Sequence, residues 1–191
     1  MNTTRLEAFS DGVLAIVITI MVLEIKVPHD TAPAALVPLI PVFLSYLLSF
    51  VYIGIYWNNH HHMLHTLQRV SGPVLLANLH LLFWLSLVPF ATGWMGQNHR
   101  AIAPSFLYGV VMVMAALAYF ILQGRIIASQ GPDSLLRRAV GRDWKGHTSL
   151  TLYLVAMLAS LRSPAVGQAV YALVALMWLI PDRRIERVLS D

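Results

Sequence analysis

The sequence predicts an all-α, polytopic membrane protein with six transmembrane helices, and three observations lead to this prediction. First, the 191 residues are 58% hydrophobic and only 12% charged, with a mean hydropathy of +0.67, whereas soluble domains carry roughly 25% charged residues. Second, the apolar residues form long stretches separated by short polar clusters. Third, the basic residues are distributed unequally between the loops. Lipid must therefore cover much of the surface.

Six stretches are apolar enough to be spanning helices, which need about 20 mostly apolar residues. They cover residues 7–26, 38–60, 73–95, 103–126, 147–162 and 165–181. Polar or Pro/Gly clusters separate them, such as Pro28-His29-Asp30 and Ser71-Gly72-Pro73. The last two stretches are short and nearly contiguous, which predicts a tight hairpin. Six spans leave no room for a soluble domain, so we expect residues 1–191 to form a single transmembrane domain.

The basic residues predict the topology. When alternate connections are assigned to opposite sides, one side receives Arg5, Arg69, Arg125, Arg137, Arg138, Arg142, Lys145, Arg183, Arg184 and Arg187, and the other receives Lys26, Arg100 and Arg162. Cytoplasmic loops carry the excess of Lys and Arg, so we expect both termini in the cytoplasm and the protein in the plasma membrane. The same clustering explains the net charge of +4 without a nucleic-acid partner. The one long connection, 127–146, is expected to contain a short helix around Leu135–Arg138.

The first span opens with an unusual polar sequence, Arg5-Leu6-Glu7-Ala8-Phe9-Ser10-Asp11-Gly12. Polar and charged side chains at the start of a membrane helix are costly unless each has a partner. One interpretation is an ordinary helix N-terminus, where Glu7 and Asp11 suit the positive end of the helix dipole and Arg5 reaches the headgroups. The other is a buried polar network that fixes this helix against its neighbours. Spacing alone does not decide between them.

Further along the first span, Ile16, Thr19 and Leu23 fall on one helical face, at positions i, i+3 and i+7. Any helix offers such a triad, and spacing alone favours an ordinary packing face. In a pore, Ile16 and Leu23 would form hydrophobic rings and Thr19 a ring of hydroxyl groups.

The second span ends with the sequence Tyr56-Trp57-Asn58-Asn59-His60-His61-His62-Met63-Leu64-His65. His61 and His65 are one turn apart, which suits a metal ion, but no carboxylate lies nearby in the sequence to complete a site. We favour the interpretation that one or two of these histidines hydrogen-bond the Arg5 and Asp11 region. Asn78 and His80 of the third span are expected at the same depth and are candidates for the same cluster.

Several functional classes lack their signatures here. Spans two to six contain no Asp or Glu in their interiors, so the carboxylate relay of a proton-coupled transporter is not visible. The sequence has no nucleophile elbow, paired acids or Gly-rich phosphate loop, which disfavours an enzyme and predicts no cofactor. It has no cysteine and no TVGYG potassium filter.

The pattern Arg5-x-x-x-Phe9-Ser10-Asp11 resembles the prokaryotic members of the transmembrane protein 175 family, potassium channels whose animal relative is found in endosomes and lysosomes. Further similar features are Ile16 seven residues after Phe9, Thr19, the sequence Trp57-x-x-His60-His61, and Asn78-Leu79 leading to Pro89-Phe90. These motifs lie in the first half of the chain, and spans four to six are generic. The number and order of spans resemble the family over the whole chain.

The resemblance implies a homotetramer in which four first helices line a central pore. Ile16 would form the narrowest hydrophobic constriction, and Thr19 and Leu23 would line the path beyond it. A network bracing the pore helix would contain Arg5, Ser10, Asp11, Trp57, His60 or His61, and Asn78. The implied function is passive, potassium-preferring conduction of monovalent cations across the bilayer. K+ would pass transiently through the pore, with no structural metal.

Three other functions are weighed at this stage. A membrane enzyme that uses the histidines as a metal site is disfavoured by the lack of nearby acids in the sequence. A secondary transporter would show broken helices at mid-membrane and an internal repeat, and the sequence indicates neither. A membrane subunit without transport activity of its own would leave the polar residues of the first span with a purely structural role.

Overall fold

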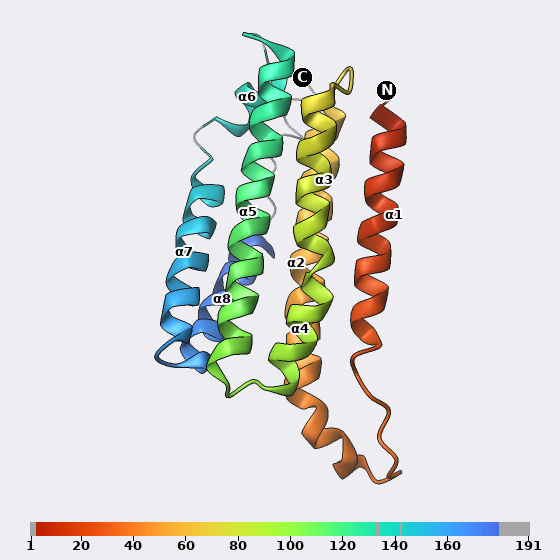
Figure 1. The fold of residues 1–191 in the computed structure, drawn as a ribbon, viewed down its shortest axis with the longest axis vertical. Coiled ribbons are helices and arrows are strands. Elements are labelled where there is room, and N and C mark those ends of the chain that lie inside the picture. The colour runs from red at the N-terminus through yellow and green to blue at the C-terminus, as the bar shows by residue number, and fades with distance from the viewer. Residues whose placement is uncertain (1–2, 133, 142, 180–191) are drawn as a thin grey trace.

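The computed structural model describes residues 3–132, 134–141 and 143–179, which fold into helices joined by short connections (Figure 1). The α-helices are α1 (Thr3–Val22), α2 (Ile40–His65), α3 (Gly72–Ser86), α4 (Val88–Gln97), α5 (Ile102–Gln130), α6 (Leu135–Val140), α7 (Trp144–Ser160) and α8 (Pro164–Leu179), and the 3-10 helix η1 (Pro33–Leu39) precedes α2. Each predicted span corresponds to one of these segments, with α3 and α4 together forming the third. The all-α prediction is confirmed.

Three helical segments are long and apolar enough to cross a membrane by length and composition: Pro33–His65, Gly72–Gln97 and Ile102–Gln130. The helix α8 is apolar but shorter, and α7 has 17 residues. The helix α1 has 20 residues but carries three charged side chains in its first half. These three helices run alongside the longer ones in the same bundle (Figure 1).

Successive long helices run in alternating directions, so α1 begins at the end of the bundle where α2 and α5 finish (Figure 1). We call this the N-terminal end. The predicted basic residues that belong to it within the described part of the chain are Arg5, Arg69, Arg125, Arg137, Arg138 and Lys145, and Lys26, Arg100 and Arg162 lie toward the opposite end. Arg142, Arg183, Arg184, Arg187 and the predicted end of the sixth span at 180–181 lie outside the described residues.

The first helix occupies Thr3–Val22 instead of the predicted 7–26. After Val22 the chain continues in a turn, where the Leu23 amide bonds the Ile20 carbonyl at 3.0 Å and the Ile25 amide bonds the Val22 carbonyl at 3.1 Å. Such i to i−3 bonds tighten a helix end, and Pro28 disfavours helix for the residue before it. The prediction that Leu23 belongs to the helix is therefore wrong, because this residue lies in the following turn.

The predicted third span is broken into α3 and α4 at Leu87. Pro89 lacks an amide hydrogen and cannot continue the hydrogen-bond ladder, which accounts for the break. Two residues later the Ala91 amide again bonds the Leu87 carbonyl, at 3.1 Å, so the chain resumes its course toward the opposite end of the bundle (Figure 1). The predicted short helix in the long connection is confirmed as α6, whose first turn is capped by the Ser134 hydroxyl accepting from the Arg137 amide at 3.1 Å.

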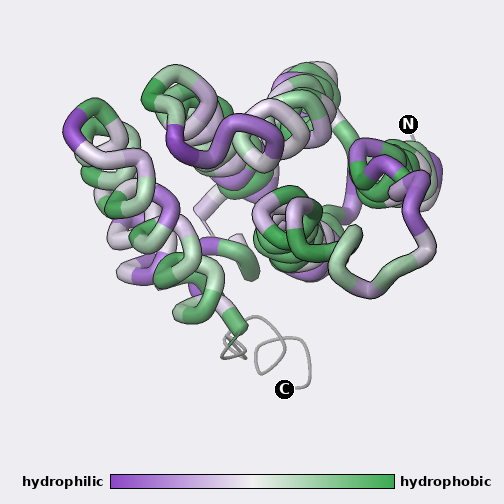
Figure 2. The backbone as a smooth tube through the Cα atoms, turned by 90° about the horizontal axis from the view of Figure 1, so that it is seen from below, coloured by the Kyte–Doolittle hydropathy of each residue, from purple (hydrophilic) through white to green (hydrophobic). Residues whose placement is uncertain are grey.

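The helices form one bundle in which α1 contacts α2, α3 and α4, whereas α7 packs between α5 and α8. Hydrophobic residues dominate the helices, and hydrophilic stretches gather at their ends and connections (Figure 2). Large apolar side chains are exposed on every long helix, including Phe50 on α2, Phe83 on α3 and Leu158 on α7. A surface of this kind is what lipid or another subunit covers.

The contacts among α5, α7 and α8 rely on small residues. A Cβ added at Gly109 of α5 would overlap the Tyr171 hydroxyl and the Met157 side chain, and one added at Gly167 of α8 would overlap the Ser160 hydroxyl and lie 2.8 Å from the Ala156 carbonyl oxygen. Small residues let membrane helices approach closely enough for extensive van der Waals contact. These glycines therefore set the spacing of this half of the bundle.

Candidate functional site on the first helix

Three buried polar side chains connect α1, α2 and α3 toward the N-terminal end. Ser10, His60 and Asn78 are each at most 1% exposed. The Asn78 amide nitrogen donates to the Ser10 hydroxyl at 2.9 Å, and the Ser10 hydroxyl donates to the Leu6 carbonyl at 2.9 Å. A ring nitrogen of His60, Nε2, lies 2.7 Å from the Asn78 side-chain oxygen. Buried polar groups at membrane depth require such partners.

The direction of these bonds fixes one hydrogen position on His60. Because the Asn78 amide nitrogen is used by Ser10, its side-chain oxygen faces His60 and can only accept. His60 therefore carries a hydrogen on Nε2. Its other ring nitrogen, Nδ1, is buried without a hydrogen-bond partner among the described residues. The network thus ends at this imidazole nitrogen.

Three further side-chain contacts join α1 to α2. The Trp57 ring nitrogen donates to the Asp11 carboxylate at 3.0 Å. One turn earlier on α1, a Glu7 carboxylate oxygen lies 2.9 Å from Nδ1 of His61 and 3.7 Å from Nε2 of His65. The polar half of α1 is therefore tied to its neighbours by side-chain contacts at three successive levels.

The opposite face of α1 is bare within the subunit. Ile16 is 58% exposed and Leu23, in the turn after the helix, is 76% exposed. The exposed Thr19 hydroxyl bonds backbone carbonyls of its own helix, at 3.0 Å to Ile16 and 3.1 Å to Ala15. In contrast, Leu14, Val17 and Met21 are buried against the other helices. The subunit packs one stripe of α1 and leaves the predicted pore stripe uncovered.

Comparisons with known proteins agree with this architecture. The family model described as "Endosomal/lysosomal potassium channel TMEM175" matches residues 5–89. A potassium channel of Chryseobacterium sp. (strain P1-3) is 51% identical over 191 residues, which cover 100% of both chains. The chain belongs to the TMEM175 family.

Other members of the TMEM175 family support the same assignment. A potassium channel of Streptomyces collinus is 38% identical over 123 residues, covering 60% of each chain. The crystal structure of a lysosomal potassium-selective channel TMEM175 homolog from Chamaesiphon minutus is 29% identical and superposes with a TM-score of 0.81 over 93% of this chain and 96% of that one. The predicted family is confirmed, and with it a multi-pass, all-α membrane protein.

The residues expected to brace the first helix come together in this TMEM175-family structure with one exception, Arg5. Ser10, Asp11, Trp57, His60 and Asn78 make the contacts described above, and His61 joins them through Glu7. Arg5 is exposed and makes no hydrogen bond or ion pair with the described residues. His80 accepts instead from the Trp84 ring nitrogen of its own helix, at 3.0 Å.

Sequence reasoning named Glu7 and His65 separately but missed the contact between them in this TMEM175-family chain. Glu7 and His65 are 58 positions apart in the sequence, so their proximity depends on how α1 packs against α2. One signal was available, because Glu7 lies one helical turn before Asp11 and so shares its face. If Asp11 contacts the second span, Glu7 is expected to contact it too.

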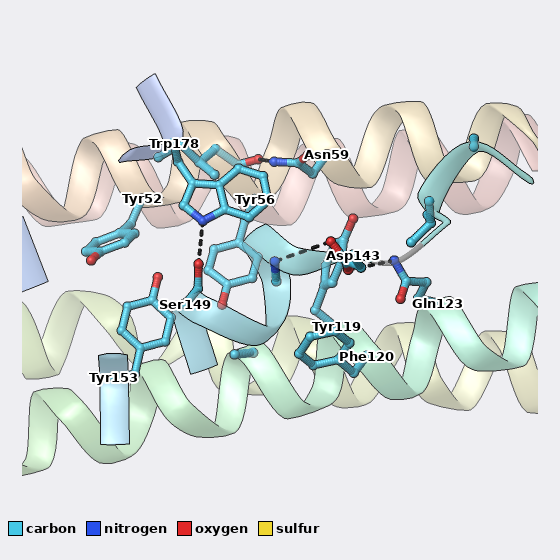
Figure 3. Close-up of a pocket in the computed structure, with 15 residues that line it drawn as sticks. Tyr52, Tyr56, Asn59, Tyr119, Phe120, Gln123, Asp143, Ser149, Tyr153 and Trp178 are labelled. Atoms are coloured by element: carbon cyan, nitrogen blue, oxygen red, sulfur yellow. Dashed lines mark hydrogen bonds between the residues drawn. The ribbon is translucent and has the colours of Figure 1, made fainter. Parts of the chain in front are cut away.

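A separate aromatic pocket lies between α2, α5 and α7, with Trp178 of α8 at its edge (Figure 3). Its cavity of about 70 Å³ is lined by, among others, Tyr52, Tyr56, Tyr119, Tyr153 and Asp143. The Trp178 ring nitrogen donates to the Ser149 hydroxyl at 2.7 Å, and Asp143 caps α7 by accepting from the Gly146 amide at 3.3 Å. No sequence motif indicated this pocket, because its tyrosines are spread over three helices.

Proposed function

We propose that this TMEM175-family chain forms a potassium-preferring cation channel, and not an enzyme. The observation that carries the proposal is the likeness over the full length, at 51% identity, to a relative named as a potassium channel. The superposition on a potassium-selective channel over 93% of the chain supports it. The bare stripe of α1 supplies a surface for the conduction path.

We place α1 along a central pore formed by four copies of the 1–191 domain. Side chains exposed in the single subunit would then face the axis, with Ile16 as the narrowest ring, Thr19 one turn further and Leu23 at the exit of the helix. Hydrophobic constrictions control conduction by excluding water, and hydroxyl oxygens can partly replace the hydration shell of a cation. Such a filter offers few fixed oxygen ligands, so we expect a modest preference for K+ over Na+.

The polar contacts on the other face of α1 would hold this stripe toward the axis. Hydrogen bonds are directional, and rotating α1 about its axis would break the bonds of Ser10, Asp11 and Glu7 together. A functional side chain is placed accurately only when the surrounding shell is itself fixed. We therefore assign Ser10, Asp11, Trp57, His60, His61 and Asn78 to bracing of the pore helix. Arg5, exposed in one subunit, is assigned to a contact with a neighbouring subunit or lipid headgroups.

For the topology we propose a plasma-membrane protein with both termini in the cytoplasm. The alternating path of the helices brings six of the predicted basic residues to the N-terminal end, against three toward the opposite end. The excess of positive charge faces the cytoplasm in membrane proteins. The N-terminal end, with the polar network, would thus be the cytoplasmic end of the pore.

The experiment is a measurement of the reversal potential of purified protein in planar bilayers under a K+/Na+ gradient. We expect a current that reverses toward the potassium equilibrium potential. Reversal at the sodium potential, or no current from protein shown to be folded and tetrameric, would contradict the proposal. Saturable, counter-ion-dependent flux in liposomes would then indicate a secondary transporter.

A further inference from the structure

The contact between Glu7, His61 and His65 has the composition of a metal site. Each residue offers one ligand atom, and the three ligand atoms all lie within 4.8 Å of one another. The set comprises two imidazole nitrogens, from residues one turn apart on α2, and one carboxylate oxygen from α1. We propose that these three residues bind a divalent transition-metal ion, with Zn2+ as the best match.

The two distances from the Glu7 carboxylate fit Zn2+ without a large rearrangement. In a tetrahedral site with metal–ligand bonds of about 2.0–2.1 Å, neighbouring ligand atoms lie about 3.3–3.4 Å apart. The Glu7 oxygen lies 2.9 Å from the His61 nitrogen and 3.7 Å from the His65 nitrogen, on either side of this value. A shift of a few tenths of an ångström would bring both Glu7 distances to this value, and the two imidazole nitrogens, which lie within 4.8 Å of each other, would have to close to the same separation.

The chemistry of the donors selects the class of ion. Imidazole suits zinc, copper and nickel, whereas Mg2+ and Ca2+ prefer oxygen ligands. One carboxylate would neutralise half of the charge of a divalent ion. Three protein ligands leave a fourth position for water, as in zinc sites that remain open to solvent.

The site is accessible but not fully exposed. The side chains of Glu7, His61 and His65 are 23%, 37% and 51% exposed, so an ion can enter from water at the N-terminal end. A hydrogen bond between Glu7 and His61 explains one of the two short distances on its own. It does not explain why a nitrogen of His65 also lies near this oxygen. The ring centroids of His61 and His65 are 4.3 Å apart.

A bound ion would connect the start of α1 to the end of α2. It would stabilise the folded protein in proportion to its occupancy, because the unfolded chain does not hold the three ligands together. This inference is independent of the proposed conduction, since binding and unfolding are measured on protein in detergent without any current.

The test is isothermal titration calorimetry of Zn2+ into detergent-solubilised protein, purified through a tag without histidine and treated with a chelator. We expect one Zn2+ per chain, no binding of Mg2+, and a rise in the unfolding temperature on addition of Zn2+. Glu7→Gln, His61→Gln and His65→Gln should each weaken Zn2+ binding at least about tenfold. His29→Gln, which changes an exposed histidine in the connection after α1, is the matched control and should leave the affinity unchanged.

Co2+ gives a second readout that does not depend on heat. Bound by two imidazoles, a carboxylate and water, it should show the strong visible absorption of tetrahedral cobalt, which His65→Gln should abolish. Because His65 is half exposed at the last residue of α2, this variant is expected to fold. Absence of Zn2+ binding at micromolar concentrations, or binding unchanged in all three variants, would overturn the proposal.

Discussion

The two halves of the bundle share interhelical hydrogen bonds but differ in how closely their helices approach. At the α1, α2 and α3 contacts, buried polar side chains form hydrogen bonds that connect Ser10, Asn78 and His60. At the α7 and α8 contact, besides the hydrogen bond from Trp178 to Ser149, Gly167 allows the helices to approach so closely that a methyl group would not fit. Lipid removes the hydrophobic drive between helices, and polar bonds and close approach are the two remaining means of association. The first fixes how a helix is rotated, and the second fixes how near it lies.

The largest effect is expected where the helices are closest. Gly167→Ala would place a methyl group 2.8 Å from the Ala156 carbonyl oxygen and against the Ser160 hydroxyl. Because a backbone atom cannot move aside easily, we expect a loss of about 3 kcal/mol of unfolding free energy. The measurement is unfolding in mixed micelles by titration with SDS.

Gly124→Ala is the matched control for Gly167→Ala. Gly124 lies in α5 with no atom within 4 Å of an added Cβ. Alanine there is expected to be neutral or to stabilise the helix by up to about 1 kcal/mol. Equal effects of the two substitutions would show that close approach does not hold the α7 and α8 half together.

The second-largest loss of stability is expected in the hydrogen-bonded contacts among α1, α2 and α3. Asn78→Ala leaves His60 and Ser10 buried without their shared partner, and each unsatisfied group costs about 1–3 kcal/mol. We expect a total loss of about 2 kcal/mol in the same titration, since a water molecule can occupy part of the space left by the amide. Asn98→Ala removes an exposed amide that, among the described residues, bonds only the Trp94 carbonyl of its own turn, and it should change stability little. A neutral Asn78→Ala would mean that the network is dispensable for folding.

A smaller loss is expected at the exposed edge of the network. Trp57→Phe keeps an aromatic ring but removes the donor to the Asp11 carboxylate. Because Trp57 is 46% exposed and water can replace the donor, we expect a loss of about 1 kcal/mol or less. A loss as large as that of Asn78→Ala would contradict the distinction between the buried and the exposed part of the network.

The smallest effect on stability, and the largest on conduction, is expected outside both contacts. Ile16→Asn adds a polar group to the bare stripe of α1, where it should wet the proposed constriction, raise the single-channel conductance and weaken ion discrimination. Leu158→Asn is the control, because Leu158 on α7 has the same exposure of 58%. Planar-bilayer recordings of both variants distinguish the pore stripe from a lipid-facing one. Unchanged current with Ile16→Asn would remove Ile16 from the pore.

The sequence predicted the contacts among α1, α2 and α3 better than those between α7 and α8, for a physical reason. Ser10, Asp11 and Asn78 stand out because polar residues in apolar stretches must have partners. Gly109 and Gly167 do not stand out, because glycine is common in membrane helices and its role depends on which atoms face it across the bundle. The number and order of the spans were predicted for the described residues, since hydropathy indicates them, but the end of α1 and the break at Leu87 were not.

Contacts between distant positions were the least predictable part of the site. The pairing of Glu7 with His61 depends on the register of α1 against α2, which no local pattern encodes. For the same reason Arg5 was expected inside the network but lies on the surface of the subunit. The end of α1 was misplaced by four residues because apolar residues continue after Val22, although the backbone already turns there.

The hydroxyl group of Thr19 has a consequence for the sign of the charge that can pass. Its hydrogen is directed to the carbonyls of Ala15 and Ile16 in its own helix. What the side chain presents outward is therefore an oxygen with lone pairs and no hydrogen. In the proposed pore, a ring of such oxygens attracts a partly dehydrated cation and offers nothing to an anion. The backbone of α1 would thus help to reject chloride, because its carbonyls accept the hydrogen bond that the hydroxyl would otherwise donate to the anion.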